Sequence, residues 1–436
     1  MHHPSDDTAG PPQAYVRSAP PSPSRFVLDA DHRTTVAVVG AGFTGLSAAL
    51  HLAEAGVSVT VLESRHIAWG ASGRAFGQVV PYLKHDHAEV MRHYGAERGA
   101  RMVDAIGAGP ALVAGLVDRF RIACGLCRSG LIFGAHAPSG TRALEARAAY
   151  WQTRGAPMEM LDTAATRAAT GSGAYATALL DHRGVHLNPF AYARGLANAA
   201  VAAGARIAED AKVQSLTRIG DAWRLQVGPH TVTADAVILA TNAYTDQLWP
   251  GLAASVIPVR GHAMVSGPLG DNLRGTILPG GQALTDTRRL FSGVRVLPDG
   301  RLHVSLDGPA FGPAAPPRVA KLNARLARLY PQLGRMVWEE AWSGFVAMTP
   351  DHFPRVHVLA PGLYAGLGYS GRGIAAATLI GSELAARIRG VADDALVFPV
   401  SPLRPLRWHR FAALPVGALL QMYRVQDAID GFSRPG

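Results

Sequence analysis

A glycine-rich turn between a predicted strand and a predicted helix constrains the fold of this chain more than any other feature. Gly40, Gly42 and Gly45 form a GxGxxG pattern directly after the apolar, β-branched run 35–39. Residues 46–55 then carry apolar side chains at helical spacing, and a second strand-like run follows. This order of strand, glycine turn, helix and strand within about 30 residues is typical of a Rossmann βαβ unit.

Each glycine has a physical role in such a unit. Gly40 permits the tight turn, Gly42 lets the backbone approach a pyrophosphate, and Gly45 allows the helix to pack closely on the strand. Unpaired N–H groups at the start of the helix favour an anion. The second strand, 57–63, ends in Glu63, whose carboxylate can accept hydrogen bonds from the hydroxyls of an adenosine ribose. The segment therefore predicts a dinucleotide site.

The composition narrows the class of protein. The chain has 436 residues, 48% of them apolar and 17% charged, as expected of a folded protein with two or three domains. The net charge is +10, but the basic residues are scattered and almost all Arg, so we expect no nucleic-acid binding. The N-terminus carries no apolar signal core, and no apolar run is long enough to span a bilayer, which favours a cytoplasmic protein.

The two cysteines form a single CxxC pattern, at Cys124 and Cys127. A zinc site needs two further ligands at a suitable distance, and no second CxxC or HxxxH follows. We expect structural cysteines and no metal site; a redox pair is the alternative.

The segment 70–78 reads Gly-Ala-Ser-Gly-Arg-Ala-Phe-Gly-Gln. It resembles the G-A-S-G-R-N-G-G-Q segment of the D-amino acid oxidase superfamily, and within it the gamma-glutamylputrescine oxidoreductase branch. In such proteins this loop runs beside the flavin ring. The match departs at Ala75 and Phe76, where the family has Asn and Gly. A Phe in this loop reshapes the pocket that the resemblance implies.

Three further segments resemble the same family in the same order. Residues 234–243 resemble the strand that ends beside the flavin, residues 342–351 the segment before the last cofactor strand, and residues 366–374 the turn that covers the flavin. Glycines before a helix also make a second anion site at that turn, and the positive helix end would stabilise a reduced, anionic flavin. The resemblance spans roughly residues 34–395 and implies FAD as the cofactor. The residues assigned to FAD are Gly40, Gly42, Phe43, Thr44, Gly45, Glu63, Ser64, Ala71, Ser72, Gly73, Gln78, Val213, Ala240, Thr241, Asn242, Gly368, Ser370, Gly371, Gly373 and Ile374.

These motifs predict an α/β fold. We expect a Rossmann-like FAD-binding domain of the glutathione reductase type, with a parallel sheet flanked by helices, and a β-rich α+β substrate domain. Because the cofactor segments lie far apart in sequence yet touch one ligand, the FAD-binding domain should be discontinuous. The expected segments are 1–33 for an extended N-terminal arm, 34–110, 185–250 and 345–395 for the FAD-binding domain, 111–184 and 251–344 for the substrate domain, and 396–436 for a C-terminal tail or helix.

The substrate side should be recognised by its orienting charges, because the cofactor supplies the hard chemistry. Arg295 is the first candidate to hold a substrate carboxylate; in the resembled branch two aromatic residues precede this Arg, and here Gly293 and Val294 replace them. Arg260 is the second candidate, and a solvated strand-edge Arg is the alternative for both. Tyr369, beside the flavin turn, is the third candidate, as a wall of the pocket.

The resemblance implies oxidation of a C–N bond in an amine or amino acid by hydride transfer to flavin N5, giving an imine that hydrolyses. Oxygen or an electron carrier would accept the electrons. Two alternatives stay open: a membrane-surface dehydrogenase that passes electrons to a quinone or carrier, and a non-catalytic flavin-binding subunit. The first draws on the C-terminal tail 403–427, whose apolar part is too short to span a bilayer but could lie on its surface; packing on the body as a helix is the alternative.

Overall fold

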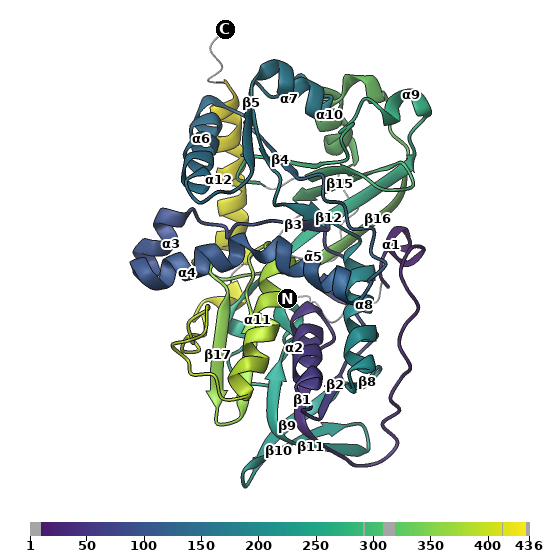
Figure 1. Ribbon diagram of the computed structural model, residues 1–436, viewed down its shortest axis with the longest axis vertical. Coiled ribbons are helices and arrows are strands. Elements are labelled where there is room, and N and C mark those ends of the chain that lie inside the picture. Colours follow the sequence, from purple (N-terminus) through teal and green to yellow (C-terminus); the bar gives the residue numbers. More distant parts are fainter. Residues whose placement is uncertain (1–9, 291–292, 308–318, 412, 433–436) are drawn as a thin grey trace.

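Two large sheets form the two halves of the molecule, as Figure 1 shows. The computed structural model describes residues 10–290, 293–307, 319–411 and 413–432. Phe291 and Ser292, which precede Gly293 in the substrate segment, lie outside the described residues, as do the ends of the arm and the tail. The fold is a mixed α/β fold, as the sequence predicts.

The first sheet is the predicted Rossmann sheet, in the strand order β17-β18-β11-β1-β2-β8. The strands from β18 to β8 run parallel, and β17 pairs antiparallel at the edge. A hairpin, β9 and β10, extends the sheet from β11. The bounds are β1 His32–Val39, β2 Val59–Leu62, β8 Arg206–Ala208, β9 Val213–Ile219, β10 Ala222–Val227, β11 His230–Leu239, β17 Arg355–Ala360 and β18 Leu363–Leu367.

Three helices cover one face of this sheet. Their sequences are largely apolar because most sides of each helix are buried. Helix α2 (Phe43–Glu54) buries ten of its twelve residues and packs between α8 (Pro189–Ala202) and α11 (Gly373–Ile388). At the contact of α2 with α11, a Cβ on Gly381 would lie 2.4 Å from the Thr44 carbonyl oxygen. Close packing of α2 on both neighbours therefore fixes the start of α2, where the phosphate site was predicted.

The second sheet is largely antiparallel, in the order β16-β12-β15-β14-β13-β4-β6-β5. Its strands are β4 Leu131–Gly134, β5 Met158–Leu161, β6 Ala178–Asp181, β12 Ile257–Pro268, β13 Ala283–Asp286, β14 Gly293–Val296, β15 Arg301–Asp307 and β16 Trp338–Met348. The helices of this half are α6 Pro138–Gln152, α7 Thr163–Thr170, α9 Asp271–Arg274 and α10 Val319–Leu329. The strands and helices of 131–181 had no sequence-based prediction.

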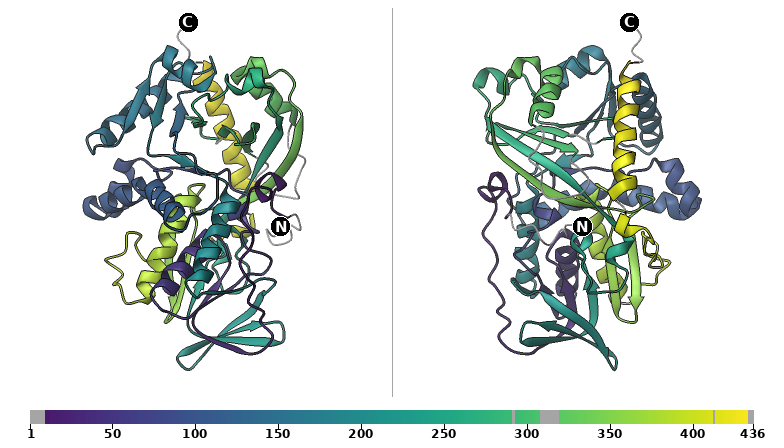
Figure 2. Two further views of the ribbon diagram at one scale, coloured as in Figure 1. Left: turned by 45° about the vertical axis from the view of Figure 1, so that its right-hand side comes forward. Right: turned by 180° about the vertical axis from the view of Figure 1, so that it is seen from behind.

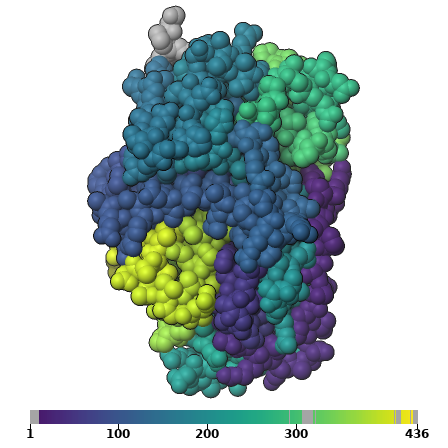
Figure 3. Space-filling view, viewed as in Figure 1, coloured from purple at the N-terminus to yellow at the C-terminus, as the bar shows by residue number. Residues whose placement is uncertain are grey.

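Helices α3 (His87–Tyr94), α4 (Ala96–Gly107) and α5 (Gly109–Arg119) lie across the junction of the two halves, as the blue band of Figure 3 shows. A small sheet of β3 (Gln78–Val79) and β7 (Val185–His186) joins the halves. The strands of the first sheet come from 32–62, 206–239 and 355–367, and those of the second from 131–181 and 257–348. The domain boundaries given above stay a prediction.

The N-terminal arm was expected to be extended, but part of it is helical. The short helix α1 (Gln13–Val16) inserts Tyr15, which is fully buried, between the two halves. The arm then runs along the half that contains the first sheet, where the Phe26 N–H donates to the Ile207 carbonyl at 3.0 Å (Figure 1, right-hand side). The Pro- and Ser-rich composition predicted the extended part, and it gave no sign that Tyr15 is an anchor.

The C-terminal tail forms the helix α12 (Ala413–Phe432) after a short 3₁₀ turn at His409–Phe411. No single helix of the described residues has the length and hydropathy of a membrane span. The pair α4 and α5, bent by 43°, passes that test by length and composition only, and its apolar side chains Met102, Ile106, Val113 and Leu116 are buried in the core.

Candidate active site

One cavity of about 900 Å³ is lined by residues of both halves. At one end it is bounded by the carboxyl ends of β1, β2 and β11, where a doubly wound sheet binds its ligand. At the other end it is bounded by β12, β16 and the loop 74–78. The cavity therefore extends from the predicted phosphate site to the second sheet.

The glycine turn forms a cradle in which side chains have no room. A Cβ on Gly45 would lie 2.0 Å from the Gly40 carbonyl oxygen, and a Cβ on Gly42 would lie 2.9 Å from the Ser72 hydroxyl. Gly40 adopts a φ of +105°, which an L side chain rarely adopts. This turn brings the positive end of α2 to the wall of the cavity, where an anion such as a phosphate is favoured.

Glu63 and Ser72 border this cradle from the second strand and the following loop. The Glu63 carboxylate accepts from the Ala41 N–H at 2.8 Å and from the Arg65 N–H at 2.9 Å. Burial raises the pKa of Glu63, and these N–H donors oppose that rise. The Ser72 hydroxyl accepts from the Phe43 N–H at 3.0 Å. A carboxylate fixed at the tip of β2 is placed to accept from ribose hydroxyls.

Two turns with unusual backbone conformations close the other side of the cofactor region. Asn242, after β11, and Ser370, before α11, are non-glycine residues with φ of +45° and +49°. The Asn242 side chain accepts from the Gly368 N–H at 3.0 Å and so joins the two turns. Such backbone strain persists where the surrounding structure holds it and is common at ligand sites.

The structure brings nearly all the residues assigned to FAD to the wall of this cavity. Those that line it are Gly40, Gly42, Phe43, Thr44, Glu63, Ser64, Ala71, Ser72, Gln78, Val213, Ala240, Thr241, Asn242, Ser370, Gly371, Gly373 and Ile374. Gly45, Gly73 and Gly368 lie behind the wall. Each packs against a neighbour that a Cβ would overlap, such as the Ala68 carbonyl oxygen, 2.1 Å from a Cβ on Gly73.

Tyr369 lines the cavity, but its hydroxyl is turned to the cofactor region. It forms a short hydrogen bond with the Thr44 hydroxyl at the start of α2. Burial raises the pKa of Tyr369, so the phenol is neutral. Tyr369 thus fixes the start of α2 against the turn before α11.

Arg260 and His262 come from β12 and line the far end of the cavity. Arg260 is buried, donates to the Ser343 hydroxyl at 2.8 Å, and lies with its guanidinium 4.4 Å from the centre of the Phe345 ring. Both contacts come from β16, the neighbour of β12 in the sheet. This buried cation is held rigidly at the cavity wall.

Arg295, the first candidate to hold a substrate carboxylate, does not line the cavity. Its guanidinium donates to His303 Nδ1 at 3.1 Å, to the Leu187 carbonyl at 2.9 Å and to the Tyr15 hydroxyl at 3.2 Å. The Tyr15 hydroxyl donates in turn to the Ala75 carbonyl at 2.9 Å. Arg295 therefore lies behind the loop 74–78 and supports it, together with the N-terminal arm.

The departures from the family pattern at Phe76 and Gly293 meet in space. A Cβ on Gly293 would lie 2.4 Å from the Phe76 ring, so the ring rests on the bare backbone of β14. The same ring lies 5.4 Å from the Arg295 guanidinium and screens it from the cavity. A large residue in the loop and a small one on the strand are thus complementary, and an aromatic wall is kept.

Sequence reasoning missed most of the charge in the cavity. Six cationic side chains line it against two acidic ones, Glu63 and Asp246; the cations are Arg65, Arg74, Lys84, Lys212, Arg260 and Arg372.

Among the described residues, Lys84 and Arg372 form no ion pair with a carboxylate. Burial and the Arg372 charge lower the pKa of Lys84 to about 8, and burial and Arg147 lower that of Arg372 to about 10. This positive balance fits an anionic ligand. Arg74 lies in the segment 70–78, Arg372 lies in the turn 366–374, and Arg260 was a named candidate; no motif marked Arg65, Lys84 or Lys212.

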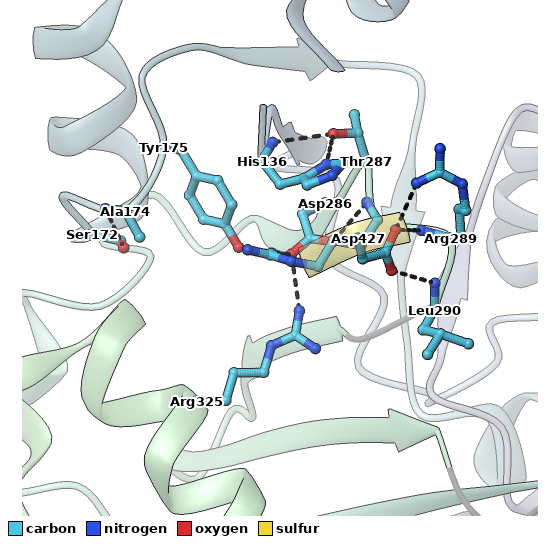
Figure 4. Close-up of polar contacts among 11 residues, drawn as sticks. His136, Ser172, Ala174, Tyr175, Asp286, Thr287, Arg289, Leu290, Arg325 and Asp427 are labelled. Atoms are coloured by element: carbon cyan, nitrogen blue, oxygen red, sulfur yellow. Dashed lines mark hydrogen bonds and ion pairs between the residues drawn. The ribbon is translucent and has the colours of Figure 1, made fainter. Parts of the chain in front are cut away.

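The cysteines stay free, with Cys124 buried and Cys127 half-buried. Burial raises the pKa of Cys124 to about 12, so it is an inert thiol. The structure does bring together one set of possible metal ligands, His136, Asp427 and Asp430. Both carboxylates already accept hydrogen bonds from Arg289, which Figure 4 shows for Asp427.

Solved structures of two oxidases have the same fold as this chain. Glycine oxidase from Geobacillus kaustophilus matches with a TM-score of 0.71 over 86% of this chain and 99% of that one, at 24% identity. Iminodiacetate oxidase from Chelativorans sp. BNC1 matches with a TM-score of 0.69 over 84% and 99%, at 20% identity. The chain thus has the same fold as these two oxidases.

The chain belongs to the DAO family of FAD-dependent oxidoreductases, whose model matches residues 35–387. It is similar to gamma-glutamylputrescine oxidoreductase of Escherichia coli (strain K12), with 32% identity over 391 residues, 89% of this chain and 91% of that protein. It is also similar to glycine oxidase of Geobacillus kaustophilus, with 27% identity over 80% of this chain and 91% of that protein. Its cofactor is FAD, which the side-chain-free cradle at Gly42 and the acceptor Glu63 fit.

Proposed function

We propose that this protein oxidises a C–N bond of an amine or amino acid. The observation that supports this most is the single cavity, which extends from the dinucleotide cradle at Gly42 to the buried cation Arg260. The relatives are named for amine and amino-acid oxidation, as in gamma-glutamylputrescine oxidoreductase and glycine oxidase. If the pyrophosphate of FAD lies in the cradle, the flavin ring would lie beside a hydride donor that is held at the other end of the cavity.

FAD supplies the hydride acceptor, flavin N5, and the imine that results hydrolyses in water. The protein binds the cofactor and the substrate and orients them relative to each other. The cradle residues named above would hold the pyrophosphate and ribose, and Val213, which lines the cavity, would contact the adenine through its backbone. The loop 74–78 and the turn 368–373 would enclose the ring. Phe76 and Phe345 would exclude water from the donor carbon.

We propose Arg260, rather than Arg295, as the side chain that holds an anionic or carbonyl group of the substrate. Its guanidinium lies at the cavity wall, whereas that of Arg295 is enclosed by Tyr15, Leu187 and His303. A guanidinium can bind a carboxylate through two parallel hydrogen bonds. Tyr369 would act as a wall and support of the cofactor region.

Oxygen or an electron carrier completes the cycle by reoxidising the flavin. Peroxide yield per turnover distinguishes the two, since only oxygen gives peroxide.

We propose a cytoplasmic protein; its contact with a membrane is argued below. A non-catalytic flavin-binding subunit is the second candidate, which the departures at Ala75, Phe76, Gly293 and Val294 favour. The close fit of Phe76 on Gly293 argues against decay of the site.

The proposal is tested by mixing the purified holoprotein anaerobically with primary amines, secondary amines and amino acids. The expected result is bleaching of the flavin absorbance by at least one class, at a rate that saturates with concentration. If dithionite bleaches the flavin and no amine or amino acid does, the oxidation proposal fails and the flavin-binding subunit remains.

A further inference from the structure

The helix α12 presents two different faces. On the inner face, Leu420 lines the cavity and Asp427 is bound to the body. Met422, Val425 and Ile429 are spaced three and four residues apart and therefore share another face. Met422 follows Leu420 by two residues, about 200° around the helix, which places this row on the opposite, outer side. Figure 2 (right) shows α12 lying on the outside of the molecule along its whole length.

The inner face is held by a defined set of polar contacts. The Asp427 carboxylate accepts from the Arg289 N–H at 3.1 Å, from the Arg289 guanidinium at 3.0 Å and from the Leu290 N–H at 3.3 Å (Figure 4). Asp430 accepts from the same guanidinium at 2.7 Å. Leu290, like Leu420, lines the cavity. These contacts fix the orientation of α12, which leaves its outer row exposed.

The outer row gathers exposed apolar surface that is rare elsewhere on this protein. Eleven large apolar side chains of the described residues are exposed, and five of them lie within 408–429. Met422, Val425 and Ile429 are 47%, 58% and 59% exposed, and Trp408 and Phe411 directly precede the helix. A row of exposed apolar side chains on one helix face is the kind of surface that marks an interaction site.

The charge around this surface indicates the kind of partner. Arg404 and Arg407 are exposed just before Trp408, and the whole chain carries a net charge of +10. A second copy of this chain would bring an equal positive charge to the same surface, which disfavours self-association. An anionic lipid surface is complementary to the arginines and accommodates an aromatic pair and an apolar helix face of this length.

We infer that the protein docks on anionic membranes through the outer face of α12, with Met422, Val425 and Ile429 buried among the lipids and Arg404 and Arg407 against the headgroups. The inner face stays on the body, so docking holds the cavity wall at Leu420 beside the bilayer surface. This inference is independent of the oxidation chemistry proposed above, because lipid binding needs no turnover.

The experiment is co-sedimentation of the full-length holoprotein with vesicles of phosphatidylcholine alone or mixed equally with phosphatidylglycerol. The test variant carries Met422→Ser, Val425→Ser and Ile429→Ser. The matched control carries Val27→Ser, Ile219→Ser and Val337→Ser, three exposed apolar residues that lie away from α12. Flavin absorbance confirms that each variant is folded.

The wild type and the control should bind the anionic vesicles on the order of ten-fold more tightly than neutral ones, and binding should weaken at high salt. The test variant should lose this binding and keep its flavin. Absence of vesicle binding by the wild type, or equal binding by the test variant, would overturn the inference. So would a dimer of the wild type that the test variant dissolves, since the row would then be an interface between copies.

Discussion

The two ends of the cavity are built in different ways. At the cofactor end the cradle is formed mainly by backbone atoms of glycines, as where Gly45 lies against the Gly40 carbonyl, and the Glu63 carboxylate is fixed beside it by backbone N–H groups. At the substrate end they are made by side chains such as Phe76, Arg260 and Leu420, which come from a loop, a strand and the last helix. Backbone sites need a contiguous motif, so they are visible in sequence. Side-chain sites are assembled by the fold, so they are not.

The largest effect should follow from filling the cradle. Gly45→Ala places a Cβ 2.0 Å from the backbone oxygen of Gly40 and 3.0 Å from Val38, and backbone cannot give way cheaply. We expect loss of FAD from the purified protein and destabilisation by about 3 kcal/mol or more. The measurement is the ratio of flavin to protein, together with thermal unfolding.

Gly115→Ala is the matched control, because Gly115 lies in α5 with open space around the added methyl group and no left-handed φ. It should keep full FAD and gain up to about 1 kcal/mol of stability. Equal behaviour of the two variants would show that the cradle is not closely packed.

The substrate end should respond to the fit between Phe76 and Gly293. Gly293→Ala alone forces a methyl group to within 2.4 Å of the ring and should lower the free energy of unfolding by about 1–3 kcal/mol. In a Phe76→Ala background the same change should cost little, because the ring is gone. A double-mutant cycle by thermal unfolding of the holoprotein measures this coupling. The same cost in both backgrounds would contradict the contact.

The cluster behind the loop 74–78 should make stability fall in acid. Burial and the Arg295 charge lower the pKa of His186 to about 4, and burial lowers that of His303 well below its ordinary value. The unfolded chain therefore binds protons below a pH of about 6.5 that the folded chain refuses, so stability is full above that pH and is lost as the pH falls towards 4.

For His186 the loss is on the order of 3 kcal/mol by pH 4. Denaturant titrations between neutral pH and pH 4 measure it. His186→Asn should flatten this dependence, and an unchanged pH slope in the variant would remove His186 as its cause.

The smallest expected effect concerns Lys84, near the turn that covers the flavin. With its pKa lowered to about 8, its positive charge is lost as the pH rises through that value. A carboxylate such as benzoate, if bound in the cavity, should then bind about ten-fold more weakly. Perturbation of the flavin spectrum follows the binding. Lys84→Met should remove this pH step and Lys84→Arg should move it beyond pH 8; a step that persists in Lys84→Met would assign it to another group.

The sequence predicted the sites that are formed by backbone groups better than the sites that are formed by side chains. The glycine turn and the turn before α11 were found because each places consecutive backbone groups at one ligand, and Glu63 was found because it ends the strand that follows the glycine turn. The sequence ranked Arg295 above Arg260, but both are strand arginines of the second sheet, and only the covering loop decides which one reaches the cavity. Tyr15 could not be found, because its arm has the composition of an extended segment.

The central claim is that the two ends of one cavity have separate roles, and Arg260→Met tests it most directly. The measurement is the anaerobic rate of flavin reduction, per bound FAD, by the amine or amino acid that reduces the wild type. The account predicts normal FAD content and catalytic efficiency lower by about 1.5–3 kcal/mol, on the order of ten- to a hundred-fold. Reduction at the wild-type rate would show that Arg260 does not hold the substrate, and loss of FAD would show that the two ends are not separate.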